Sequence, residues 1–291
     1  MPENLKALRL RIRSVKKTKK ITRAMEMVSA AKLRKTEGVM KASRPFIEKI
    51  RTLIGRLALS TGAENHPLFQ KSDTGISLLV VFTSDRGLCG AFNANILKLA
   101  TIALDQNPAM QVYVIGRKGR DFMRRKYRDR IHGVLTDLNG TLDGATTDKL
   151  GEMLLTGFLD GKYSNIKLLF PHFVSTASNK PVIEQYLPFN AEAFGATGSD
   201  DAKTGIDYLL EPSPERVFDA ILPRFLKSRL FLVLAETFTS EYSSRMMAMN
   251  NATKNCNELT GTLTIRLNKA RQAAITTEII EIVSGAQALE G

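Results

Sequence analysis

The strongest constraint on the fold is that both ends of the chain read as very long helices, residues 2–58 and about 225–289, around a compact α/β middle. A helix rises ~1.5 Å per residue, so a helix of this length would span on the order of 80 Å, far more than the diameter of one domain. Its apolar stripe must be buried along that whole length. The two helices are therefore predicted to pair as an antiparallel coiled coil, a shaft that favours mechanical coupling over a ligand pocket.

The first helix starts with an apolar stripe at three-and-four spacing, formed by Leu5, Leu8, Ile12 and Val15. Lysines then interrupt this stripe, and its predicted continuation comprises Ile21, Met25, Val28, Val39, Ala42, Phe46, Ile50, Leu53 and Leu57. The close succession of Ile21, Thr22 and Met25 predicts a slip in the heptad register.

Ser213-Pro214-Glu215 predicts the start of the second helix, with a capping serine, a first-turn proline and a first-turn acid. Pro223 is predicted to kink the helix or break it briefly. Beyond it, a coiled-coil seam with alternating four-and-three spacing runs through Tyr242, Met246, Met249, Thr253, Cys256, Thr260, Leu263, Leu267, Ala270 and Ala274. Several of these side chains are small or polar, which predicts weak pairing and an enclosing partner or domain.

The formal net charge is +13, and the excess is concentrated in two places. Residues 6–35 carry 12 lysines and arginines against Glu26 alone, and a second basic cluster lies at residues 117–130. A basic stripe along a long helix implies an acidic partner, which leaves nucleic acid, a membrane surface and an acidic protein open. The second cluster is equally compatible with a solvated helical face.

The middle of the chain, residues 75–190, alternates strands with helices. The predicted strands are 76–82, 110–115, 131–138, 165–175 and 182–189, of which the last two are close enough to pair antiparallel. The predicted helices are 93–106, 119–127 and 146–159. Repeated βαβ units predict a doubly wound, Rossmann-like α/β sheet with helices on both faces.

Sites for chemistry are scarce in this sequence. The glycine pairs Gly87/Gly90 and Gly116/Gly119 fit tight turns, because neither the dinucleotide fingerprint nor a phosphate loop is present. The three histidines lack the spacing of zinc ligands and lie far from any candidate nucleophile. No apolar run reaches about 20 residues, and Cys89 and Cys256 are expected to be reduced thiols. We expect no catalytic residues, cofactor or metal.

Three sequence blocks resemble signatures of the gamma subunit of the rotary F-type ATP synthase. They are ITRAMEMVSAAKLRK at residues 21–35, SDRGLCGAFN at residues 84–93 and NKARQAAITTEIIEIVSGAQAL at residues 268–289. Their order and spacing match those of that family, so the resemblance covers essentially the whole chain. It is much more specific than any of the glycine or histidine patterns.

The resemblance implies a non-catalytic rotor shaft. In that family the terminal helices form an antiparallel coiled coil inside a ring of three alpha and three beta subunits, and the central domain sits beside epsilon on the c-ring. Proton flow turns the c-ring, and the asymmetric shaft drives the beta sites through successive nucleotide affinities. The lack of a transit peptide favours a bacterial protein that is peripheral on the cytoplasmic face of the plasma (inner) membrane, with a processed organelle protein as the alternative.

The resemblance also implies partner-contact residues. Met25 matches a position near the acidic lever segments of the beta subunits, and Arg245, Arg271, Gln272, Thr276 and Glu278 match positions on the opposing helix. Because Arg271 and Gln272 follow the seam residue Ala270, they are expected to turn away from the seam. Tyr208 and Glu211 correspond to the foot that meets epsilon and the polar loops of the c-ring.

The expected organisation is a shaft helix at 1–58, an α/β domain at 75–190, a linker and foot at 191–211 and a second shaft helix at 212–291. Two other classes of function remain open on sequence grounds. A basic coiled-coil protein could bind nucleic acid through residues 6–35, although the sequence has no reading module or aromatic platform. An enzyme on a doubly wound domain would need a cofactor site, and the missing glycine fingerprint counts against it.

Overall fold

The computed structural model of the chain describes residues 5–61, 66–70, 72, 74–138, 140, 142–190 and 210–290. The chain divides into two compact units. Unit 1 comprises residues 1–29 and 245–291, and unit 2 comprises residues 30–244. Helix α1 (Leu5–Thr61) and helix α6 (Pro214–Glu290) each contribute to both units.

Unit 2 contains a five-stranded sheet in the order β3-β2-β1-β4-β5. Its strands are β1 (Ile76–Phe82), β2 (Gln111–Ile115), β3 (Ile131–Leu135), β4 (Tyr163–Ser175) and β5 (Ser178–Leu187). Strands β1 to β4 pair in parallel, and β5 pairs with β4 antiparallel. The predicted doubly wound sheet with an antiparallel final pair is therefore confirmed.

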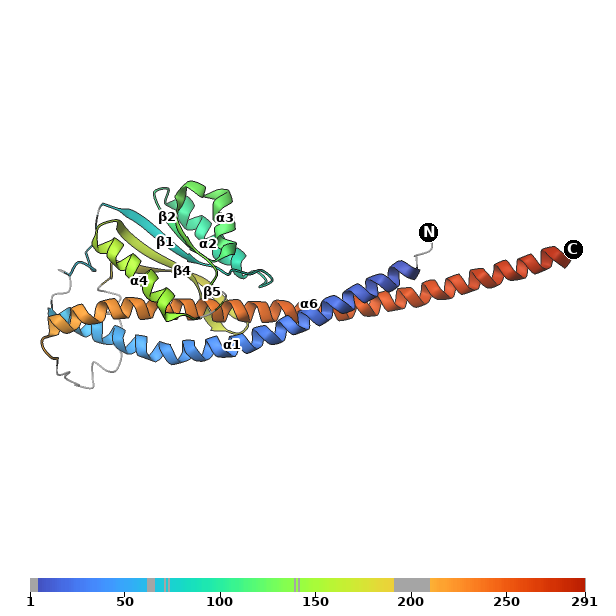
Figure 1. Cartoon of the computed structure of the whole chain (residues 1–291), viewed down its shortest axis with the longest axis horizontal. Coiled ribbons are helices and arrows are strands. Elements are labelled where there is room, and N and C mark those ends of the chain that lie inside the picture. The colour runs from blue at the N-terminus through green and yellow to red at the C-terminus, as the bar shows by residue number, and fades with distance from the viewer. Residues whose placement is uncertain are drawn as a thin grey trace. The chain divides into compact units, whose positions relative to one another are not determined.

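The connecting helices are α2 (Phe92–Gln106), α3 (Arg117–Lys126) and α4 (Gly144–Leu159), with a short 3-10 helix η2 (Arg128–Arg130) before β3. Right-handed crossovers place α2 and α3 on one face of the sheet, while the reversal in strand order puts α4 on the other face with α6 (Figure 1). On the first face, a buried core joins α2 to the inward side chains of β1 and β2, among them Leu79, Val81, Ile96, Leu104, Val112 and Val114.

On the opposite face, α6 is enclosed by unit 2 on nearly all sides. Every residue from Leu232 to Ser243 is buried. This stretch overlaps the continuous apolar run LFLVLA at 230–235, and a helix segment that is apolar all round must be covered all round. Its second half is largely polar, and the side chains of Glu236, Thr239 and Ser240 are buried there as well. Tyr186 of β5 donates a hydrogen bond from its hydroxyl to the Leu226 carbonyl at 3.0 Å, which ties the sheet to α6.

The start of α6 agrees with its predicted signals, since the helix begins at Pro214 and the Ser213 hydroxyl accepts a hydrogen bond from the Arg216 N–H at 3.4 Å. A break at Pro223 is not observed, because α6 continues through it without interruption. The burial pattern around Pro223 supplies the reason: Leu222, Phe225 and Leu226 are buried, and their packing outweighs one lost backbone hydrogen bond.

The predicted stripe of α1 is wrong in its middle. Ile21, Val28 and Phe46 are 52%, 58% and 58% exposed. The residues that are buried or half-buried keep an unbroken three-and-four spacing, through Leu5, Leu8, Ile12, Val15, Lys19, Thr22, Glu26, Ser29, Leu33, Thr36, Met40, Ser43, Ile47, Ile50, Ile54 and Leu57. The register does not slip. The prediction was wrong because the seam in this region is formed by polar residues such as Thr22 and Ser29. The apolar residues next to them, Ile21 and Val28, lie on the exposed surface.

The seam predicted for α6 agrees with the structure within unit 1. Met249, Thr253 and Leu263 are buried, and Met246, Cys256, Thr260, Leu267 and Ala270 are half-buried. Ala274, the last predicted member, is exposed.

Candidate partner-binding surfaces

The seam of unit 1 is joined by polar contacts. The hydroxyl oxygens of Thr22 and Thr253 lie 2.8 Å apart, and the Asn250 amide donates to Glu26 Oε1 at 2.9 Å. The other Glu26 oxygen is buried and accepts no hydrogen bond among the described residues, although the Arg23 guanidinium lies 3.6 Å from it. Polar groups in a seam specify one register at some cost in stability.

This register shows how far the described part of α1 reaches along α6. The Thr22–Thr253 contact is antiparallel, so each step toward the start of α1 is matched by a step toward the end of α6. Counting back, Leu5, the first described residue of α1, lies opposite Ala270. Beyond that point every residue of α6 whose side chain is described, 271–287, is exposed.

We call residues 271–287 of α6 the tip. It exposes five large apolar side chains that are 48–67% accessible, namely Ile275, Ile279, Ile280, Ile282 and Val283. Contiguous exposed apolar surface of this kind marks an interaction site in most soluble proteins. The tip is therefore the strongest candidate for partner binding in unit 1.

The residues expected to contact partners fall into different environments. Arg271, Gln272, Thr276 and Glu278 all lie exposed on the tip, and Thr276 donates its hydroxyl to the Gln272 carbonyl at 3.0 Å. Met25 is half-buried beside the seam position Glu26. Arg245 is buried at 7% exposure. Glu211 is exposed just before α6, and Tyr208 lies outside the described residues.

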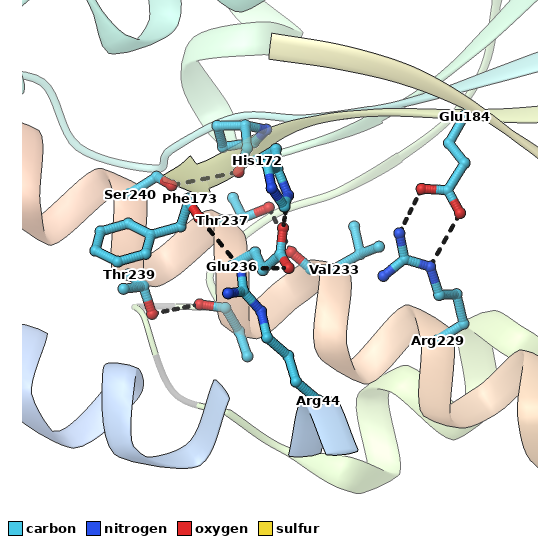
Figure 2. Close-up of polar contacts among 12 residues, drawn as sticks. Arg44, His172, Phe173, Glu184, Arg229, Val233, Glu236, Thr237, Thr239 and Ser240 are labelled. Atoms are coloured by element: carbon cyan, nitrogen blue, oxygen red, sulfur yellow. Dashed lines mark hydrogen bonds and ion pairs between the residues drawn. The ribbon is translucent and has the colours of Figure 1, made fainter. Parts of the chain in front are cut away.

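A second polar cluster anchors α6 within unit 2 (Figure 2). Glu236 of α6 is 2% exposed, and its two carboxylate oxygens meet the Arg44 guanidinium at 3.0 Å and His172 Nδ1 at 2.9 Å. Arg44 also donates to the Phe173 carbonyl at 3.2 Å, so one guanidinium joins α1, β4 and α6. Nearby, Arg229 forms a two-bonded pair with Glu184 of β5. This cluster holds unit 2 together and requires no ligand.

The loop of the SDRGLCGAFN block is built from internal hydrogen bonds. Asn93 accepts the Ser84 N–H at 3.1 Å and donates its amide to the Ser84 hydroxyl at 2.8 Å. Asp85 accepts the backbone N–H groups of Arg117 and Asp137, each at 3.1 Å. These bonds join the ends of β1, β2 and β3.

Gly116 and Gly119 serve close packing in this region. A Cβ atom on Gly116, whose φ is +95°, would lie 2.3 Å from the Thr83 carbonyl oxygen. One on Gly119 would lie 2.6 Å from the Thr83 hydroxyl oxygen. Gly116, with its positive φ, agrees with the predicted tight turn, whereas Gly119 lies within α3 and is a packing glycine instead.

No group of three or more His, Cys, Asp or Glu side chains among the described residues could hold a metal ion. No helix in the described part of the chain is long and apolar enough to cross a membrane.

Sequence reasoning missed the two polar pairs of the seam and the Glu236 cluster. The Thr22–Thr253 and Glu26–Asn250 pairs were overlooked because polar residues were read as interruptions of the stripe. A strict heptad count from Leu5 onward would have found the α1 members of both pairs. The Glu236 cluster carried no comparable signal, since its members lie 64 and 192 residues apart in the chain.

The chain combines a doubly wound α/β domain with two long antiparallel helices, and comparison with known sequences identifies its family. The sequence profile of the family described as "ATP synthase" matches residues 4–289. The ATP synthase gamma chain of Geobacter sp. (strain M21) is 39% identical over 292 residues, covering 99% of both chains. That of Moorella thermoacetica is 40% identical over 289 residues, again covering 99% of both. The chain belongs to the ATP synthase gamma-chain family.

Solved structures support the fold. A chain of the Euglena gracilis mitochondrial ATP synthase (F1 and c-ring, rotational state 3) superposes with a TM-score of 0.69 at 19% identity, covering 98% of this chain and 94% of that one. A chain of the Tetrahymena thermophila mitochondrial ATP synthase central stalk and c-ring gives a TM-score of 0.58 at 24% identity, covering 80% of this chain and 99% of that one.

Proposed function

We propose that this chain is the central rotor shaft of an F-type ATP synthase, coupling proton-driven rotation of a c-ring to ATP synthesis or hydrolysis at beta subunits. One observation carries the proposal beyond family membership. The tip of α6 extends past the residues opposite the described part of α1 and exposes a row of isoleucines. An unpaired apolar helix needs an enclosing partner, and a ring of subunits around the tip supplies one.

The partners we propose are three alpha and three beta subunits around the shaft, with epsilon and the c-ring at its foot. Arg271, Gln272, Thr276 and Glu278 are exposed on the tip and can contact the surrounding ring. An arginine presents a planar set of donors that suits a carboxylate, and glutamine adds a donor and an acceptor. Glu211 is exposed and can contact the foot partners, and we extend the same role to Tyr208.

Met25 and Arg245 contribute differently. Both lie at or beside the seam of unit 1, so we propose that they set the shape of the shaft presented to the beta subunits. We propose no nucleic-acid partner for the basic face of α1, whose charge suits the acidic segments of beta subunits.

We further propose that the chain is not itself a catalyst and acts from the cytoplasmic face of a bacterial plasma membrane as a peripheral subunit. Purified chain, free of beta subunit, should neither bind nor hydrolyse ATP. Turnover above background in such a preparation would contradict this part of the proposal.

The decisive experiment tests the tip. Ile279→Asp with Ile282→Asp places two charges on its apolar surface, which should lower ATP-driven proton pumping in membranes and reduce the alpha and beta subunits recovered with a tagged chain. Val174→Asp is the matched control, because Val174 is 56% exposed on β4 of unit 2. Unchanged pumping and recovery in the double variant would refute the shaft assignment.

Hydrogen exchange provides an independent measurement. Backbone amides of residues 5–35 and 242–285 should exchange much more slowly in the assembled complex than in the free chain. Equal protection in both states would indicate a helix pair that needs no enclosing ring.

A further inference from the structure

The second basic cluster, at residues 117–130, includes basic side chains for which the described residues provide no hydrogen bond or ion pair. Five of its eight basic side chains are engaged within unit 2. Arg117 pairs with Asp137, Arg120 with Asp121 at 2.8 Å and Lys126 with Asp105 at 3.5 Å. Arg125 donates to the Asp121 carbonyl at 3.1 Å, and Arg130 donates to the Leu104 and Met110 carbonyls, each at 2.9 Å.

Arg124 and Arg128 are different. Both are exposed, and neither guanidinium forms a hydrogen bond or a close ion pair among the described residues, although the charge of Arg124 also acts on the Asp121 carboxylate. Together with Ile131 and Val134 of β3 they line an open hollow of about 560 Å³. The hollow thus combines two unpaired cations with two partly exposed β-branched side chains.

The strand beside this hollow is an edge strand. Strand β3 is the last in the order β3-β2-β1-β4-β5, so one of its sides has no neighbour within the described sheet. The Leu135 carbonyl accepts the Gly116 N–H at 2.8 Å, which directs the polar groups of Leu135 toward β2. Because these groups alternate along a strand, the N–H and C=O of Val134 point to the open side.

We propose that an extended acidic segment of a protein partner docks here, adding a strand to the open edge of β3 while its carboxylates pair with Arg124 and Arg128. Edge strands offer a template for strand addition, in which backbone bonds give affinity and side-chain pockets give specificity. Unpaired guanidinium groups beside the edge select an anionic segment, since each can bind a carboxylate through two parallel hydrogen bonds. A flat anionic surface would meet the arginines without using the strand edge or the hollow.

This surface lies outside the residues assigned to the shaft. If the bound segment belongs to another rotor subunit, it rotates together with this chain. If it belongs to a stationary subunit, its binding to β3 opposes rotation.

The test uses the full-length chain and a fluorescein-labelled peptide, acetyl-Glu-Val-Glu-Val-Glu-Val-Glu-amide, with fluorescence anisotropy as the readout. Arg124→Gln combined with Arg128→Gln should weaken peptide binding by at least about tenfold. Lys118→Gln combined with Arg125→Gln is the matched control. It removes two exposed positive charges from the same helix without touching the hollow, and it should change binding by less than about threefold.

Strand addition is tested separately from charge. Val134→Pro removes the outward N–H at a position where an edge strand tolerates proline, so binding should be lost while the circular dichroism spectrum stays unchanged. Two peptides N-methylated at either their valines or their glutamates keep the charge of the parent but lose the donors on one side. One of the two should fail to bind, which gives a result even if Val134→Pro does not fold.

Three results would overturn the proposal. The first is an equal loss of binding in the control variant, and the second is equal binding of both N-methylated peptides, either of which would indicate nonspecific charge attraction. The third is failure of the parent peptide to bind. If phosphatidylglycerol vesicles then bound through Arg124 and Arg128, the surface would be a lipid site instead.

Discussion

The hydroxyl oxygens of Thr22 and Thr253 lie 2.8 Å apart in the buried seam of unit 1, although 231 residues separate them in the chain. Each hydroxyl also bonds its own helix, Thr22 to the Lys19 carbonyl and Thr253 to the Met249 carbonyl. The two hydroxyls have only two protons for these three contacts, so the hydroxyl that donates across the seam shares or gives up the bond to its own carbonyl. The contact still fixes which residues of α1 and α6 lie opposite each other.

Replacing Thr22 alone should lower the free energy of unfolding more than replacing Thr22 and Thr253 together. Thr22→Val leaves the Thr253 hydroxyl without its partner across the seam, so we expect a loss of about 1 kcal/mol in the free energy of unfolding. Thr22→Val with Thr253→Val buries two matching methyl groups and should return close to the wild-type value. Urea unfolding of the full chain, as a double-mutant cycle, measures the coupling. A double variant that loses the sum of both single effects would show that the hydroxyl contact is unimportant.

Two arginines of unit 2 should differ strongly when mutated. Arg44→Met leaves the Glu236 carboxylate, 3% exposed, facing His172 alone, and should lower the free energy of unfolding by roughly 3 kcal/mol. Arg229→Met removes an otherwise similar pair, but Glu184 is 44% exposed and can be solvated, so its cost should stay below about 1 kcal/mol. Guanidinium unfolding compares the two variants directly. Equal losses would mean that burial of Glu236 does not control the outcome.

Stability should fall in mild acid because of His132. Burial, aided by Lys162, holds the pKa of this side chain below its ordinary value of 6.5. Below pH 6.5 the unfolded chain binds a proton at this histidine more readily than the folded chain does. The contribution of neutral His132 to the free energy of unfolding is therefore complete above pH 6.5 and decreases as the pH falls toward the pKa of the folded state. His132→Gln keeps a donor and an acceptor for Gln111 and Tyr163 but cannot titrate. Its melting temperature should depend less steeply on pH between 7.5 and 5.5; an unchanged slope would assign the effect to other groups.

The exposed pair Arg271 and Gln272 should matter only in the complex. Replacing both with alanine removes no seam contact, since both side chains are exposed, so the helix content of the chain should not change. ATP turnover and proton pumping by the assembled complex should fall severalfold, because contacts from the tip to the ring are weakened. Asn268→Ala with Lys269→Ala, also exposed, provides the control. Wild-type rates in the first variant across a range of salt would identify Arg271 and Gln272 as ordinary surface.

Much of the architecture could be predicted because it depends on local periodicity. The strands and helices of the middle region lie within a few residues of their predicted positions, and the α6 seam was located from spacing alone. Counting 100° per residue from Ala270 predicted that Arg271 and Gln272 turn away from the seam, but every side chain described from 271 to 287 is exposed, so their exposure does not test that count. For the strands, the helices and the α6 seam, the spacing of apolar residues within a single segment is enough for the prediction.

The α1 stripe shows where this approach stops. Apolarity favoured Ile21 and Val28 for the seam, yet Thr22 and Ser29 are buried instead. Which face of a helix is buried depends on what lies opposite. Thr22 lies opposite Thr253, whose hydroxyl is within hydrogen-bond distance of its own. Ile21 and Val28 lie exposed on the surface of α1.

The sequence by itself therefore determined the class of fold, the family and the α6 side of the helix pairing, because periodicity and signature blocks lie in consecutive residues. Only the tertiary structure decided how the polar groups are matched. It joined Glu236 to Arg44 and His172, and it left Arg124 and Arg128 unpaired beside the open edge of β3. Such matches unite residues from separate elements, and their energies depend on burial and geometry that no single segment specifies.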